Sequence, residues 1–232
     1  MQPYFVWNGV DSRAMGVIVS SYPPIIRPAE RVIQQTIPGR AGALIQTEGA
    51  DIYDAYVRTF VIGVRPGMDS QRIANWLRGP GVAVFGNEPE YRYFGRILAA
   101  VQFDKVGSWQ LKSAGVQMLT QPYKGKSPRE PDISISAASF SLYNPGDVAS
   151  RPIIQLSGGG NITLTLGNVS MAFSDAPSLL RIDCDAQIIT QADGTLWTGS
   201  WTGKFLSIPT GTSQGTVTGG AELTITPEWR WL

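Results

Sequence analysis

The stretch that decides how the whole sequence is interpreted is Asp69-Ser70-Gln71-Arg72-Ile73-Ala74-Asn75-Trp76-Leu77-Arg78-Gly79-Pro80. Asp69 is a good N-cap, since its carboxylate can accept hydrogen bonds from the free backbone N–H groups of a first helical turn. Gly79 can adopt the left-handed conformation that ends a helix, and Pro80 cannot continue one. The stretch therefore predicts one short helix near residues 69–79.

The predicted helix carries a single apolar face. Ile73, Trp76 and Leu77 follow the i, i+3, i+4 spacing that brings side chains together on a helix. A helix this short is not stable by itself and needs a sheet to pack on. The flanking sequence supplies one: residues 56–64 form the strongest strand pattern of the first half, and residues 82–85 resume a strand after the helix.

Composition indicates a mainly β protein. The 232 residues include 26 glycines and 16 prolines, a load of turn residues that suits many short strands. The formal net charge is +1, so no strong field recruits nucleic acid or an anionic membrane. No apolar run approaches the roughly 20 residues of a membrane span, and the first residues do not resemble a signal peptide.

The sequence does not contain the usual residues of an enzyme site. Histidine is absent, which removes the commonest general base and the commonest nitrogen ligand of zinc. The one cysteine, Cys184, falls on the apolar face of an alternating segment, residues 179–190, which we expect to be one continuous strand. Cys184 is then a small core residue. We expect no enzyme activity, no cofactor and no metal.

A change in composition divides the chain. Residues 121–132 contain three prolines, several charges and almost no aliphatic residue, which is typical of a linker. We expect an N-terminal β-sandwich-like domain with one packed helix over residues 1–130. The pattern of residues 131–232 predicts short strands and turns, which is typical of a β-sandwich or jelly roll.

Near the N-terminus, Asn8-Gly9 predicts a tight hairpin that joins residues 4–7 to residues 16–20.

Two groups of side chains in the second half leave alternatives open. Trp197 and Trp201 can stack on sugar rings, or they can be core or subunit-contact residues. Asp183 and Asp185 are expected on one strand face, where they form either a glycosidase pair, a calcium site or a solvated surface.

The order of several short motifs resembles the distal tail protein (Dit) family of long, non-contractile-tailed phages and related prophages. The chain opens with Phe5-Val6-Trp7-Asn8-Gly9 and Met15-Gly16-Val17-Ile18-Val19, and Ile37-Pro38-Gly39-Arg40-Ala41-Gly42 is similar to the family's Pro-Gly-Arg-X-Gly turn. The helix ending at Trp76-Leu77 and the aromatic strand Tyr91-Arg92-Tyr93-Phe94 follow in the family's order. The second half resembles the family's galectin-like sandwich and closes with Pro227-Glu228-Trp229-Arg230-Trp231.

The resemblance implies a structural protein of the virion tail tip, made in the cytoplasm of the bacterial host. Such a baseplate hub is a sixfold ring, built by the first domain, that joins the tail tube protein to the tail-associated protein and the receptor-binding protein. We expect Pro38, Gly39 and Arg40 to be a subunit contact in this homohexamer, with a plain surface turn as the alternative. The alternative function is a carbohydrate-binding module that uses Trp197 and Trp201, and a glycosidase that uses Asp183 and Asp185 is a third.

Overall fold

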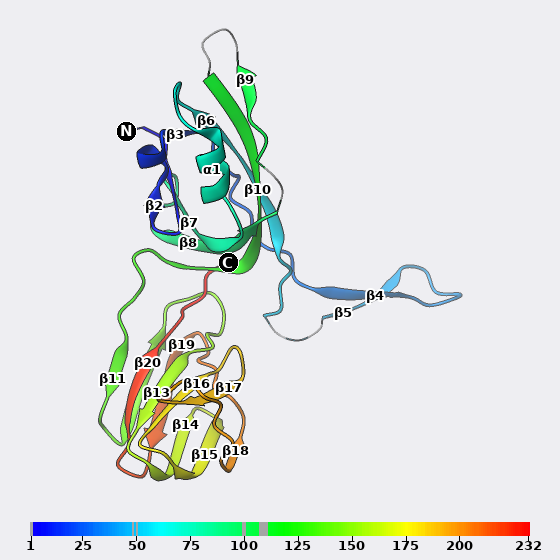
Figure 1. The fold of residues 1–232 in the computed structure, drawn as a ribbon. Coiled ribbons are helices and arrows are strands. Elements are labelled where there is room, and N and C mark those ends of the chain that lie inside the picture. The colour runs from blue at the N-terminus through cyan, green and yellow to red at the C-terminus, as the bar shows by residue number, and fades with distance from the viewer. Residues whose placement is uncertain (1, 48, 50, 99–100, 107–110) are drawn as a thin grey trace. The chain divides into compact units, whose positions relative to one another are not determined.

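The computed structural model describes residues 2–47, 49, 51–98, 101–106 and 111–232. Two compact units make up the chain: residues 1–128 with Leu232, and residues 129–231. The described part is strand-rich and contains one α-helix, which confirms the mainly β class (Figure 1). Residues 99–100 and 107–110, which the sequence pattern placed in or beside strands, lie outside the described residues.

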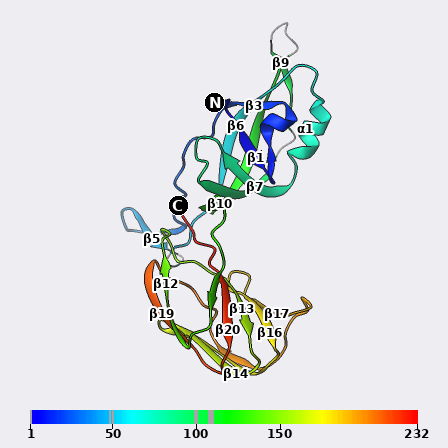
Figure 2. The ribbon, with the colours of Figure 1, turned by 90° about the vertical axis from the view of Figure 1, so that its left-hand side faces the viewer.

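The first unit is built on one antiparallel sheet that curls into a half-barrel (Figure 2). The path across the sheet is β2 (Val10–Asp11), β1 (Phe5–Trp7), β7 (Pro80–Phe85), β8 (Tyr91–Ile97), β10 (Leu111–Lys126), β6 (Tyr56–Val64) and β3 (Val17–Ser21), with β9 (Asp104–Val106) paired to β10. Val19 in β3 donates a backbone hydrogen bond to Pro3, just before β1. The two ends of the curled sheet therefore approach each other around a shared core.

The helix predicted from the sequence is α1 (Ser70–Trp76). The backbone N–H of Gln71 donates to the Asp69 carboxylate at 2.9 Å, and Gly79 has a φ of +74°. Ile73 and Leu77 are buried in the core of the half-barrel, and the half-buried Trp76 stacks on Phe5 at 5.3 Å. The cap, the apolar face and the glycine stop are all confirmed.

Strand partners near the N-terminus differ from the prediction. Asn8 and Gly9 do form a turn with positive φ, but the returning strand is β2, directly after the turn. The expected partner, β3, follows the 3-10 helix η1 (Ser12–Met15) and pairs with β6 instead. β3 goes to β6 because the buried residues Val17 and Val19 then lie in the same core as Val64 and Ile62.

Half of the expected linker is a strand. Residues 121–126 continue β10, and the pairing of β10 with β8 shifts register between Thr120 and Lys124. The irregularity therefore lies in this interval. A glycine inside a strand pattern often indicates a bulge, but Ala114 and Gly115 pair with β6 in unbroken register. The prolines of this segment are evidence against a strand. Pro122 is nevertheless compatible with β10, because it lies in the interval where the ladder with β8 is interrupted and no N–H group is needed there.

A separate hairpin leaves the first unit between β3 and β6. It consists of β4 (Val32–Thr36) and β5 (Ala43–Thr47), which pair only with each other. Gly39 and Gly42 in the connecting turn have positive φ, as a tight reversal requires.

The second unit contains two five-stranded antiparallel sheets. In the first sheet the order is β11 (Ile133–Ile135), β20 (Glu222–Thr226), β13 (Ile153–Ser157), β16 (Leu179–Asp183) and β17 (Ile188–Gln191). In the second it is β12 (Ser139–Asn144), β19 (Gly211–Val217), β14 (Gly160–Leu166), β15 (Val169–Ala176) and β18 (Trp201–Gly203). Buried aliphatic side chains from both sheets form the core of this sandwich.

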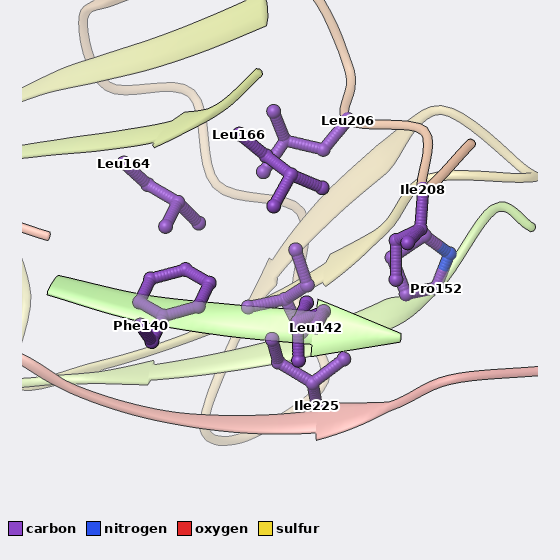
Figure 3. Close-up of a pocket in the computed structure, with 9 residues that line it drawn as sticks. Phe140, Leu142, Pro152, Leu164, Leu166, Leu206, Ile208 and Ile225 are labelled. Carbon is purple, nitrogen blue, oxygen red and sulfur yellow. The ribbon is translucent and has the colours of Figure 1, made fainter. Parts of the chain in front are cut away.

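The interior of the sandwich contains a small apolar gap of about 10 Å³ (Figure 3). Its walls include Phe140 and Leu142 from β12, Leu164 from β14 and Ile225 from β20. No polar side chain lines the gap, so a water molecule there would have no hydrogen-bond partner among these side chains. The gap is a packing imperfection of the core rather than a ligand cavity.

At two places in the second unit the structure differs from what the sequence pattern indicates. The segment 179–190 is a hairpin, because residues 184–187 turn and Gln187 adopts a φ of +57°. The Asp183 carboxylate stabilises this turn by accepting from the backbone N–H of Ala186 at 2.9 Å. The other difference is β19, which the sequence pattern missed because its residues are Gly, Ser, Thr and Gln up to the final Val217.

Replacing Trp76 with alanine tests the packing of the helix. Trp76→Ala removes the ring stacked on Phe5 and the indole hydrogen bond to the Trp7 carbonyl, 3.3 Å long. We expect the free energy of unfolding of the first unit to fall by about 3 kcal/mol, measured by urea denaturation. Asn75→Ala, at an exposed position of the same helix, is the matched control. Equal losses for the two variants would contradict the packing of α1 on the sheet.

Candidate interaction surfaces

The hairpin of β4 and β5 exposes apolar side chains on both of its faces. Nine of its ten strand residues are exposed and Leu44 alone is half-buried. Ile33 is 48% exposed and Ile45 is 62% exposed. A two-stranded ribbon without a third strand or a covering layer is at best marginally stable in water. The hairpin is therefore a surface that lacks a neighbour within the described part of its own chain.

The root of the hairpin is held by polar and aromatic contacts. Arg31 forms an ion pair with Asp54 at 2.7 Å, and the backbone N–H of Arg31 donates to the carbonyl of Ile52. The Tyr53 ring meets the Tyr123 ring edge-on at 6.1 Å. Because Tyr123 belongs to β10, these contacts connect the hairpin to the central strand of the first unit.

The predicted contact residues Pro38, Gly39 and Arg40 lie in the turn of this hairpin. All three are exposed, and the backbone N–H of Arg40 closes the turn by donating to the carbonyl of Ile37 at 3.1 Å. Their role as a subunit contact stays a prediction. Sequence reasoning missed the exposed aliphatic residues of the adjoining strands, although the Val-Ile-Gln-Gln pattern without strict alternation was a usable signal.

A buried charge cluster lies at one end of the half-barrel. Arg58 is 1% exposed, and its Nη1 atom is 3.7 Å from the Glu88 carboxylate. The guanidinium also lies over the Tyr93 ring at 3.9 Å, and the Tyr93 hydroxyl donates to Glu88 at 2.7 Å. Burial, followed by this hydrogen bond, raises the pKa of Tyr93 well above its ordinary value. Lys124, 4.0 Å from Glu88, adds a second cation.

This cluster joins three segments that are distant in sequence. Arg58 comes from β6, Tyr93 from β8 and Lys124 from β10, while Glu88 comes from the turn before β8. A buried charge is tolerated only when it is paired and hydrogen-bonded. The cluster therefore fixes the turn against the three strands, and its role is structural. Glu88 lies in a turn beside Pro89, and nothing in the local sequence indicates its burial.

Trp197 and Trp201 lie beside the two sheet edges formed by β17 and β18. Both rings pack near the buried Phe173, at 5.8 Å and 6.5 Å between ring centroids, and Trp201 also meets Phe205 edge-on at 5.1 Å. Both tryptophans are half-buried. These contacts indicate that the two rings cover the part of the sandwich core that contains Phe173. Sugar stacking stays a prediction, and a glycan array probed with Trp201→Ala beside the parent chain tests it.

The two aspartates proposed for chemistry are separated by the turn. Asp183 accepts backbone hydrogen bonds from Asp185 and Ala186, so it caps the turn rather than facing a ligand. Asp185 pairs with Arg230 at 2.8 Å and with Arg151 at 3.7 Å. The expectation of one shared strand face for both carboxylates is wrong, because residues 184–187 do not continue the strand.

Cys184 is a core residue, as the alternating pattern predicted. It is 2% exposed, and burial raises the pKa of its thiol to about 12. Among the described residues, no three His, Cys, Asp or Glu side chains cluster in a way that could hold a metal ion. The described part also has no helix long and apolar enough to cross a bilayer.

Together, the curled sheet with one helix and the two-sheet sandwich define a two-part, mainly β fold. The fold matches the crystal structure of the Dit protein of phage SPP1, described as a paradigm of the hub adsorption apparatus in phages that infect Gram-positive bacteria. The match has a TM-score of 0.69 and 15% sequence identity, and covers 98% of this chain and 99% of that one. The chain therefore has the distal tail protein fold, which confirms the resemblance found in the sequence.

The phage p2 baseplate, in its activated conformation with Sr, gives a weaker match. The TM-score is 0.45 at 8% identity, over 97% of each chain. Neither a scan of protein-family models nor a search of curated proteins found a match to this sequence.

Glu88→Ala tests the buried charge cluster. The substitution leaves Arg58 as an unpaired buried cation and removes the acceptor of the Tyr93 hydroxyl. We expect the free energy of unfolding to fall by about 3–5 kcal/mol, measured by urea denaturation. Glu90→Ala removes an exposed carboxylate from the same turn and serves as the control, with little expected effect. A Glu88 variant as stable as the control would show that the cluster does not support the fold.

The thiol of Cys184 provides a third test. Thiolate is the reactive form, and at pH 8 a thiol with a pKa of about 12 stays almost entirely protonated. We expect Ellman's reagent to label the native chain at least about 100-fold more slowly than the chain in guanidinium chloride, where one thiol per chain reacts. Rapid labelling of the native chain would contradict the burial of Cys184.

Proposed function

We propose that this protein is a structural component of a phage or prophage tail tip, made in the cytoplasm of the bacterial host. In this proposal it forms the hub that joins the tail tube protein to the tail-associated and receptor-binding proteins. The observation that carries the proposal is the match of both units, over 98% of the chain, to the fold of SPP1 Dit. The role lies in protein surfaces, without catalysis and without a cofactor.

The hub is proposed to be a closed homohexameric ring built by the first unit. Identical subunits in head-to-tail contact form a ring when the rotation between them closes. The hairpin of β4 and β5 supports such a contact, because its exposed Ile33 and Ile45 would be covered by a neighbouring subunit. Pro38, Gly39 and Arg40 then lie where the hairpin reaches the neighbour. The sixfold symmetry itself comes from the family resemblance.

The charge of the chain suits a tail through which DNA passes. With a formal net charge of +1, the protein has no large excess of basic residues. A strongly basic wall would bind the phosphate backbone through counterion release and retain the DNA. We therefore propose no specific nucleic-acid partner and no insertion into a membrane.

Native mass spectrometry of the purified chain tests the ring and the hairpin contact together. Ile45→Asp places a charge on the hairpin, where it would be buried against the neighbour at a large cost. We expect the parent chain to form a hexamer over a concentration series and Ile45→Asp to remain smaller, with the far-UV circular dichroism spectrum of the folded parent chain. Ile188→Asp, at an exposed isoleucine of the second unit, is the control and keeps the hexamer.

A hexamer that persists in Ile45→Asp would exclude the hairpin as the contact. A parent chain that is monomeric at the highest concentration would count against assembly without the tail tube. Immunogold labelling of virions tests the location directly, because a tail tip without label would overturn the tail-tip assignment.

A further inference from the structure

Three of the four sheet edges in the sandwich are protected. β11 and β18 have only three residues each. β17 is covered on its outer side, where Gln191 bonds to Thr195 and Trp197 bonds to Ile189 through the backbone. Short and covered edges are the usual means by which proteins prevent unwanted strand pairing.

The fourth edge, β12, has none of these protections. It is six residues long, Ser-Phe-Ser-Leu-Tyr-Asn, with no charge, no proline and no bulge in its pairing with β19. The sheet order gives it a single neighbour. β12 is therefore the one sandwich edge in the described part that is both long and open.

The register identifies which backbone groups of β12 are unpaired. The N–H of Val217 donates to the carbonyl of Ala138 at 2.9 Å, so this pair is a hydrogen-bonded one. Antiparallel pairs alternate between hydrogen-bonded and non-hydrogen-bonded. Ser139, Ser141 and Tyr143 are therefore the residues whose N–H and C=O groups point away from β19.

An independent contact supports this assignment. The carbonyl of Gln214, the residue opposite Ser141, accepts from the backbone N–H of Gly167, on the side of β19 that faces away from β12. Among the described residues, no backbone hydrogen bond outside the ladders involves Ser139, Ser141 or Tyr143. All three side chains are exposed, and that of Tyr143 is 66% exposed.

The two faces of the sheet at this edge differ in chemistry. The outward face continues from β12 into the exposed side chains of Thr212, Gln214 and Thr216, and Asp175 is the only charged residue in the five strands of the sheet. The inward face presents Phe140 and Leu142, which line the apolar gap of the core (Figure 3). An added strand would meet uncharged polar groups on one side and an apolar layer on the other.

We propose that β12 accepts a strand from another protein of the tail tip by β-augmentation. The partner segment is extended and uncharged, with polar residues alternating with apolar ones, since that pattern matches the two faces beside β12. Its backbone pairs with Ser139, Ser141 and Tyr143. This inference rests on the proposed function, which supplies the assembled tail tip in which the partner is present.

A second copy of the chain does not fit this edge in the proposed ring. Antiparallel pairing of β12 with the β12 of another copy is a two-fold contact, in which each surface meets itself. A head-to-tail ring repeats a contact between two different surfaces. Pairing of β12 with the β12 of another copy is therefore excluded in the proposed ring, and a strand of a different polypeptide is the occupant that we propose.

Hydrogen exchange measured by mass spectrometry on isolated chain and on purified virions tests the proposal. We expect the amides of Ser141 and Tyr143 to exchange at least about tenfold more slowly in the virion than in the isolated chain. The amide of Leu142, which points into the ladder with β19, is the internal control and is protected in both states. A chain that is present in the virion with unprotected Ser141 and Tyr143 amides overturns the augmentation alone.

Two variants separate the edge from the sheet as a whole. Ser141→Lys places a charge on the open edge, which disfavours an added strand. Thr202→Lys places the same charge on β18, the opposite edge of the same sheet. In virions we expect Ser141→Lys to lose the protection of Tyr143 and Thr202→Lys to keep it, while both purified variants melt at the parent temperature. Equal protection in the two variants overturns the proposal.

Other occupants give different results. Protection of the isolated chain that rises with its concentration identifies a second copy on β12 and overturns the proposal. Protection induced by soluble dextran identifies a glycan site on the sheet and likewise overturns it. If antibody labelling finds no chain in the virion, both the tail-tip function and this inference fail.

Discussion

The first unit depends on the pairing of β6 with β10. Nine consecutive residue pairs, from Tyr56–Thr120 to Val64–Lys112, hold these strands in unbroken register. That register places Arg58 inside the half-barrel, where it meets Glu88, and it brings Tyr123, three residues past the ladder, to the root of the exposed hairpin. The core, the buried charges and the hairpin are thus positioned by one ladder of backbone hydrogen bonds. A shift of the β6–β10 register by one residue would turn Arg58 toward solvent, together with the buried Ile62 and Val64 on the same face of β6.

The two surfaces proposed as assembly contacts share one physical origin. A strand has backbone N–H and C=O groups on both sides, and these groups must be paired or solvated. In the first unit, no third described strand pairs with the hairpin of β4 and β5, and its isoleucines are exposed. In the second unit, β12 is long, uncharged and paired on one side only. Each surface is incomplete within the described part of its own chain, and this is the basis of the two proposed contacts.

Local features of this fold could be predicted because their causes lie within a few residues. The Asp69 cap, the stripe that begins at Ile73 and the stop at Gly79 specify α1 without any knowledge of the sheet. Turns with positive φ at Asn8-Gly9 and at Gly39 follow from the same kind of local preference. Errors arose where a pattern was compatible with two outcomes. Residues 179–190 alternate as a strand does, yet the Asp183 side chain stabilises a turn within them.

The sequence by itself determined the class of the fold, the single helix, most strand positions, the core location of Cys184 and the resemblance to distal tail proteins. These follow from backbone preferences, side-chain periodicity and composition, which act over short distances along the chain. Only the tertiary structure decided which strands pair, that Glu88 is buried with Arg58, that Trp197 and Trp201 cover part of the sandwich core, and that β12 remains open. Each of these depends on contacts between residues far apart in sequence, and whether such a contact forms is set by the packing of the whole unit.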